Sequence, residues 1–400
     1  MTFFTAPLFD YCPVRFSDIG LLLLLFYVVL GKKDLMIPRC SKWAFLFIVW
    51  IVFDFLLLSG DKDFLAVNYI FSAIRIFFGM LIITLLPVSG IIEKIDMKKL
   101  GLALKRVVMF HVYLVLVYAF LFYVFKIESL FNIVSPYEKS QIIKENYLLK
   151  THFRTIIVEK ERYRMCGLFE EPAWFGWVIN LLIGIVFQIE TSYKKIVLKK
   201  KEHILLFIAY LLVKSLSAIA GLVIIYMVRY FFQRKITLAV AFKTIFAAMA
   251  GVGVFAVVFW TRLGNIVSLN DASSLFRVIG SFNLAFNTMK NNPLTGYGLG
   301  DMNRNIVIAK YLNNNPVGIK LPGYDLVLDL HNMLLSVLCT LGFVGFIIFL
   351  NLYKPLFRAK QYIILVSFFI VFFTLNVFTT YFFYTAIGLS YIIAFKARRT

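Results

Sequence analysis

The sequence predicts an all-α polytopic integral membrane protein with about 11 transmembrane helices (10–12) and two long outward loops that carry short amphipathic helices. Two observations predict this class. Of the 400 residues, 61% are hydrophobic and only 16% are charged, whereas soluble domains have roughly 45–50% apolar and about 25% charged residues. The apolar residues also form runs long enough to cross a hydrocarbon layer of about 30 Å. A soluble enzyme is excluded, because a globule of this length cannot bury so much apolar surface.

The individual spans follow from the apolar runs between charged breaks. They lie near residues 17–31, 43–59, 65–88, 107–125, 173–190, 203–216, 218–233, 237–260, 331–351, 361–377 and 379–395. Only a short polar break separates the two spans in each of the regions 203–233 and 361–395. The whole chain, residues 1–400, is expected to form a single membrane domain.

The distribution of Lys and Arg predicts the orientation of the chain. The short basic segments contain 23 Lys or Arg and four acidic residues; they are 31–42, 90–106, 191–202, 229–236, 352–361 and 396–400. The long segments 126–172 and 261–330 are nearly neutral, with 14 basic and 11 acidic residues. The positive-inside rule then places the basic segments and the C-terminus in the cytoplasm, and both long loops and the N-terminus outside. Most of the net charge of +21 therefore reflects topology, and a nucleic-acid partner is not expected.

Both outward loops show helical spacing of apolar residues. Such residues are Ile142, Ile143, Tyr147 and Leu148 in the first loop, and Leu275, Phe276, Ile279, Phe282 and Phe286 in the second. In the second loop, Arg277 opens the predicted helix and the triplet 291–293 (Asn-Asn-Pro) ends it. Short helices lying on the outer face are the expected result.

Three glycines follow that helix at alternate positions, Gly296, Gly298 and Gly300. Glycines at this spacing allow backbone N–H groups to approach an anion or a sugar closely, which makes the three residues candidate substrate-binding positions. A flexible loop without a ligand is the alternative interpretation.

His331 and Asn332 stand where the second loop enters a span. Histidine titrates near neutral pH, so His331 is a candidate general base. The alternative is a polar residue that only caps the span at the membrane interface.

The first loop ends with Arg164, Glu170 and Glu171 shortly before the next span. Arg164 could bind a phosphate through two parallel hydrogen bonds, and a glutamate could bind sugar hydroxyls. These side chains could equally form a solvated face at the membrane surface.

Arg75 lies about ten residues into the third predicted span, where an arginine is costly, roughly 2.5–3.5 kcal/mol on insertion scales. It either bonds backbone carbonyls or Asp54 of the neighbouring span, or faces a polar cavity that binds substrate.

Three stretches of the chain, taken together, resemble the bacterial O-antigen polymerase and ligase superfamily. The first is the pattern R…NPLTGYGLG…HNMLLSVLCTLGFVGFIIF, which begins at Arg277. The second is RMCGLFEEPAWFG at the end of the first long loop, and the third is RFSDIGLLLL at 15–24. The resemblance covers most of the chain as a topology and about 80 residues as motifs.

The resemblance implies an enzyme of the Gram-negative inner membrane, a metal-independent inverting glycosyltransferase that needs no cofactor. A polymerase transfers a growing undecaprenyl-diphosphate-linked polysaccharide to a new lipid-linked repeat unit, and a ligase transfers a finished chain to lipid A-core. Arg164 and Arg277 match the family's diphosphate-binding arginines, Arg75 matches an arginine common in this span, and His331 matches the candidate base. A chain-length regulator protein is a further partner that this resemblance suggests.

Polymerase is the leading hypothesis, and the ligase of the same superfamily is the nearest alternative. A flippase or other transporter of lipid-linked oligosaccharides is an alternative of a different class. It is disfavoured because few charges lie within the spans while the outward loops are long. A peptidoglycan polymerase fits the histidine motif poorly. A DxD motif, Asp61 to Asp63, could hold a divalent ion, although this pattern is more typical of a plain turn.

Overall fold

The computed structural model describes residues 41–60, 64–85, 95–134, 155–159, 162–167, 169, 172–194, 197–233, 281–300, 332–374 and 381–397. Within them the chain is mainly helical. The helices are α2 (Ser41–Leu58), α3 (Ala66–Leu85), α5 (Met97–Tyr123), α7 (Pro172–Tyr193), α8 (Lys200–Val213), α9 (Leu216–Gln233), α12 (Ser281–Asn291), α14 (Met333–Asn351), α15 (Lys354–Arg358), α16 (Tyr362–Thr374) and α17 (Tyr381–Ala397).

Nine of the predicted spans coincide with helices of this described part, and both regions with short polar breaks, 203–233 and 361–395, contain two separate helices as expected. The predicted spans 17–31 and 237–260 lie outside the described residues. By length and composition, α5, α7 and the run Met333–Arg358 could each cross a membrane, and shorter apolar helices accompany them. The class of helical membrane protein is thus confirmed.

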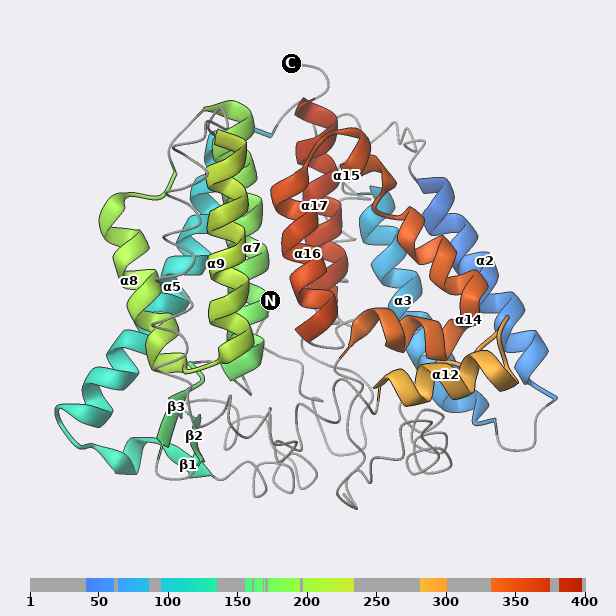
Figure 1. Cartoon of the computed structure of the whole chain (residues 1–400), viewed down its shortest axis with the longest axis horizontal. Helices are drawn as coiled ribbons and strands as arrows, with labels where there is room; N and C mark the ends of the chain where they lie inside the picture. Colours follow the sequence, from blue (N-terminus) through green and yellow to red (C-terminus); the bar gives the residue numbers. More distant parts are fainter. Residues whose placement is uncertain are drawn as a thin grey trace.

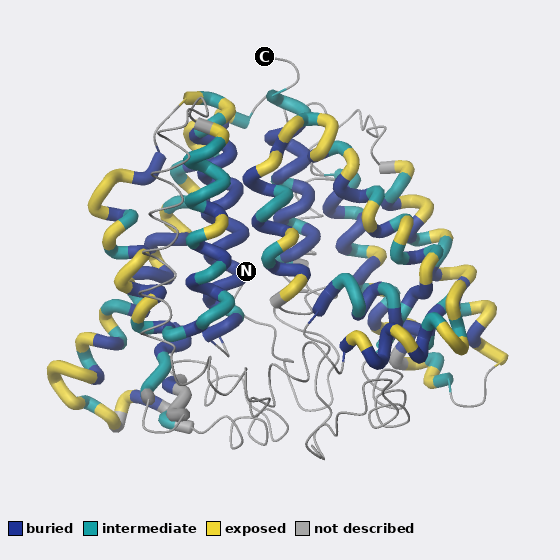
Figure 2. The backbone as a smooth tube through the Cα atoms, viewed as in Figure 1, coloured by how far each residue is buried: buried dark blue, intermediate teal, exposed yellow. Residues whose placement is uncertain are grey.

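Helix α7 forms the centre of the bundle and packs against α5, α9 and α16. It is buried along almost its whole length, whereas α2, α5 and α8 expose one face (Figure 2). Small residues permit this close packing. A Cβ atom at Gly176 would lie 2.2 Å from the Cβ of Ala218 in α9, so these two helices can approach this closely only with glycine at 176.

Buried hydrogen bonds join α7 to its neighbours. The Asn180 amide donates to the carbonyl of Ala218 at 3.0 Å and accepts from the hydroxyl of Tyr210 at 2.8 Å. Both side chains are fully buried. One polar side chain in α7 therefore holds α8 and α9 together, and all of these polar groups have partners in the apolar interior.

Two ion pairs tie the helices together at the end where the sequence predicts the cytoplasm. Glu190 pairs with Arg229 at 2.7 Å, and Lys105 pairs with Glu202 at 2.9 Å. Glu190 also accepts the backbone N–H groups of Val197 and Leu198. These contacts link α5, α7, α8 and α9 through the basic segment 191–202.

The opposite end of the bundle carries the described parts of both long loops. The strands β1 (Asn132–Val134), β2 (Thr155–Glu159) and β3 (Arg162–Met165) lie there together with α12, whereas α17 ends at the other end (Figure 1). The sheet has the order β1-β2-β3. Strand β1 runs parallel to β2, and β2 runs antiparallel to β3. This sheet was not expected from the sequence, and the helix expected around 142–148 lies outside the described residues.

Candidate functional site

Helix α14 is broken at Gly342, where the backbone adopts φ 63° and ψ −170°. Its first half runs beside α12 across the end of the bundle, and its second half turns into the bundle (Figure 1). The span predicted at 331–351 is present as α14, but the break within it was not predicted from the sequence. Glycine is the residue that adopts such a conformation without steric cost, so Gly342 sets the position of the break.

The break is filled by the glycine turn, residues 292–300, which follows α12. The backbone N–H of Tyr297 donates to the carbonyl of Cys339 at 2.8 Å, and that of Gly298 donates to the carbonyl of Thr340 at 3.0 Å. In return, the N–H of Phe343 donates to the carbonyl of Pro293 at 2.8 Å. Backbone groups that the broken helix cannot pair internally are thus bonded by another segment, as an apolar environment requires.

The alternate glycines of this turn permit close approach to protein backbone. At Gly296 an added Cβ would lie 2.4 Å from the carbonyl oxygen of Cys339, whereas at Gly298 it would lie 2.9 Å from the Leu58 side chain. The N–H of Gly296 bonds the carbonyl of Asn292 at 2.9 Å. The N–H groups of Gly296 and Gly298 are therefore used inside the protein, and the anion cradle predicted from the spacing does not form at these two positions. Gly300 also has a positive φ, 113°.

Trp50 of α2 provides a third bond to the break. Its indole Nε1–H donates to the carbonyl of Leu341 at 3.1 Å. Three consecutive carbonyls, those of residues 339–341, are thus bonded from outside the helix. This hydrogen bond joins the break in α14 to α2.

Asn332 begins α14 as its N-cap, since its side-chain oxygen accepts the N–H of Leu335 at 3.1 Å. The side chain is buried. The predicted entry of the second loop into a helix at this point is confirmed, and His331 directly precedes the cap in the sequence. His331 itself lies outside the described residues.

Helix α12 ends at Asn291, as predicted from the Asn-Asn-Pro triplet. Its buried side is unusually polar and includes Asn283, Asn287 and Thr288, whereas Phe282 and Phe286 are more than half exposed. An amphipathic helix whose apolar face points outward is suited to the boundary between lipid and water. The amphipathic helix expected in the second loop is therefore present, with its two phenylalanines facing away from the protein.

Arg164 lies on β3, where it pairs with Ile157 of β2 in the register of the sheet. The strand is anchored by its neighbours: Met165 is fully buried, and the ring of Tyr163 lies 4.8 Å from that of Phe122 in α5. Successive side chains of a strand point to opposite faces, so the half-buried Arg164 points away from these anchors.

The structure places these candidates on two sides of the same end of the bundle. The strand β3 contacts α5 and α8, whereas the glycine turn contacts α14 and α2 (Figure 1). Arg164 therefore belongs to a different group of elements from Gly296, Gly298 and Asn332.

Arg75 is half-buried in the middle of α3. Asp54, the partner considered for it, is fully buried and lies 2.8 Å from the hydroxyl of Tyr69 through Oδ2. The Oδ1 atom of Asp54 has no hydrogen-bond partner among the described residues. Asp54 is therefore bonded to Tyr69 of α3, and its Oδ1 atom makes no hydrogen bond to Arg75.

The remaining predicted site residues, Arg277, Glu170 and Glu171, lie outside the described residues, as do Asp61 to Asp63. The structure adds two positions that sequence reasoning missed, Trp50 and the break at Gly342. A glycine inside a strongly apolar span, with a glycine-rich segment shortly before it, is the signal that could have indicated the break. No sequence signal pairs Trp50 with it.

Comparison with known proteins adds an independent finding. A family model described as O-antigen ligase matches residues 203–350. That segment includes α12, the glycine turn, Asn332 and the break in α14. A search of curated proteins found no match. This match is consistent with the O-antigen polymerase and ligase superfamily, which the motifs of the chain resemble.

Proposed function

We propose that this protein is an O-antigen polymerase of the Gram-negative inner membrane. In this proposal it transfers the growing undecaprenyl-diphosphate-linked polysaccharide to a new lipid-linked repeat unit at the periplasmic face. The family match and the apolar helical bundle support the superfamily and the membrane location. The proposal includes one membrane domain over 1–400, with periplasmic loops at 126–172 and 261–330.

One observation carries the proposal. The glycine turn is bonded to the break in α14, and Asn332 caps the first turn of that helix. These contacts hold two described parts of the chain at one end of the bundle: the glycine turn, and Asn332, which directly follows His331 in the sequence. A rigid support for the residues that perform chemistry is what a transferase site requires.

In the proposed reaction, His331 is the catalytic base. It accepts the proton of the attacking sugar hydroxyl while the new glycosidic C–O bond forms at the anomeric carbon and the bond to the diphosphate breaks. The undecaprenyl diphosphate leaves with the bonding electron pair. Arg164 and Arg277 would stabilise the charge that accumulates on it. Arg75 lies about 9 Å deeper in α3 than Tyr69, at about 1.5 Å per residue, and its long side chain would extend outward toward that charge. Glu170, Glu171, Gly300 and Asn332 would contact sugar. The proposed reaction uses no metal and no cofactor.

The test is a silver-stained lipopolysaccharide gel of a strain that lacks this gene, beside its parent. Core that bears a single repeat unit supports the polymerase. Bare core without polymer would point to the transport of the lipid-linked unit and overturn the proposal. An unchanged ladder would assign the protein to another glycan.

The ligase is the second candidate, because the matching family model is described as O-antigen ligase. The same strain separates the two. Bare core together with accumulated lipid-linked polymer would identify a ligase.

A further inference from the structure

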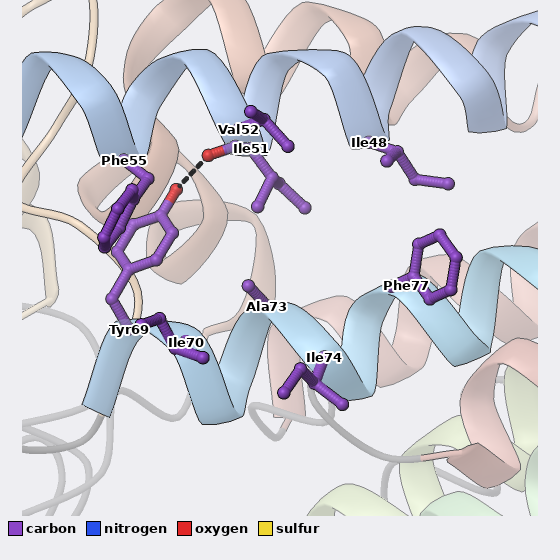
Figure 3. A pocket seen from close by; sticks show the side chains of 9 residues that line it. All are labelled: Ile48, Ile51, Val52, Phe55, Tyr69, Ile70, Ala73, Ile74 and Phe77. Atoms are coloured by element: carbon purple, nitrogen blue, oxygen red, sulfur yellow. Dashed lines mark hydrogen bonds between the residues drawn. The ribbon is translucent and has the colours of Figure 1, made fainter. Parts of the chain in front are cut away.

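An apolar groove of about 260 Å³ runs between α2 and α3 (Figure 3). Branched aliphatic and aromatic side chains form its walls, and the small Ala73 leaves a hollow in the α3 wall. The lining residues are Ile48, Ile51, Val52, Phe55, Tyr69, Ile70, Ala73, Ile74 and Phe77. We call this the α2–α3 groove.

The groove follows the direction of the helices. From Tyr69 to Phe77, α3 rises about 12 Å at about 1.5 Å per residue. Val52, Ile74 and Phe77 are each between 42% and 56% exposed, so the groove is open along one side. On the orientation predicted from charge, Tyr69 and Phe55 form its outer end, and Ile48 and Phe77 lie deeper in the hydrocarbon layer.

The outer end of the groove touches the glycine turn. The rings of Phe55, Phe64 and Tyr69 form a cluster with centroids 5.4 to 5.8 Å apart. A Cβ added to Gly298 would lie 3.0 Å from Phe64 and 3.3 Å from Tyr69. The groove is therefore continuous with the segment that supports the candidate site, and Tyr69 belongs to both.

We infer that the α2–α3 groove holds the first isoprene units of a polyprenyl diphosphate, those next to the diphosphate. This inference rests on the proposed function, which requires such a lipid at the outward end of the bundle. A chain that enters at Phe77 and leaves at Tyr69 would present its head group beside the glycine turn. The stiff β-branched walls and the hollow at Ala73 suit a methyl-branched, unsaturated chain, and the aromatic cluster suits its double bonds.

The test is photolabelling of the full-length protein in nanodiscs. The probe is a sugar-free polyprenyl diphosphate with a photoreactive group on its second isoprene unit. We expect cross-links to peptides that contain residues 48–55 and 69–77, and we expect excess undecaprenyl diphosphate, but not phosphatidylglycerol, to compete with them. Ala73→Trp fills the groove and should reduce labelling at least tenfold. Ala103→Trp, which adds the same side chain to the exposed face of α5, should leave labelling unchanged.

Other outcomes would overturn the inference in distinguishable ways. If undecaprenyl diphosphate reduces labelling at other helices, and Ala73→Trp does not affect that labelling, the lipid binds elsewhere. The proposed function is then not contradicted. If phosphatidylglycerol also reduces labelling of the groove, the groove binds only ordinary membrane lipid. If excess undecaprenyl diphosphate reduces labelling at no position, the result would count against the proposed substrate itself. Mapping on the unmodified protein decides between these outcomes even if Ala73→Trp fails to fold.

Discussion

Gly342 in α14 faces the carbonyl oxygen of Leu294 in the glycine turn so closely that an added Cβ would lie 2.1 Å from it. No side chain fits at this distance. The two segments are 48 positions apart in the sequence, and their contact makes the break in α14 and the glycine turn one structural unit.

Gly342→Ala should destabilise this unit, because alanine at φ 63° is strained by about 1–3 kcal/mol and its Cβ meets the Leu294 carbonyl. We expect a lower midpoint of thermal unfolding in detergent and a loss of polymer on lipopolysaccharide gels. Gly60→Ala is the matched control, since nothing lies within 4 Å of the added atom there. Equal midpoints for the two variants would contradict the role of Gly342.

Trp50→Phe keeps an aromatic ring in place but removes the indole donor to Leu341. The carbonyl at the break then loses that partner, which costs about 1–3 kcal/mol if water does not replace it. A fall in the thermal midpoint is the expected result. Trp43→Phe, on the same helix, is the control. If Trp50→Phe were no less stable than the control, the bond to the break would be unimportant.

Arg277→Ala and His331→Ala should abolish polymer while the amount and the topology of the protein remain normal. Loss of a general base typically slows a reaction about 10²- to 10⁴-fold. Lys290→Ala removes an exposed cation from the same loop and should retain the wild-type ladder. Wild-type ladders from either of the first two variants would refute the proposed site.

Glu202 lies at the predicted cytoplasmic start of α8 and should make stability depend on pH. Burial alone raises the pKa of Glu202, but the backbone N–H of Lys199 and the ammonium of Lys105 outweigh it, so the pKa lies below its usual value of 4.5. A lowered pKa stabilises the folded state above pH 4.5, and this contribution is lost as the pH falls further.

Glu202→Gln should therefore unfold at a lower temperature than the wild type at pH 7. The difference should shrink below pH 4.5, as measured by thermal unfolding in detergent. A difference that stays constant between pH 7 and pH 3.5 would show that the charge of Glu202 is irrelevant. Glu128→Gln provides a control carboxylate on the outward side.

The sequence by itself determined the class of the protein and most of the helix positions. These properties depend on the length and polarity of local segments, because lipid requires every backbone group in a span to bond within its own helix. The end of α12 at Asn291 and the start of α14 at Asn332 were predictable for a similar local reason. Turn and cap residues act on their immediate neighbours.

Only the tertiary structure decided what the glycines of the turn do. Their spacing fits an anion cradle as well as a close contact with another backbone. Which of the two forms depends on whether backbone groups without partners lie beside the turn. Residues 339–342 of α14 provide such groups, because the helix is broken there, and the sequence did not predict this break. The bond from Trp50, the sheet beside α5 and the groove between α2 and α3 have the same origin. Each arises from the packing of segments distant in sequence, which local polarity and spacing do not specify.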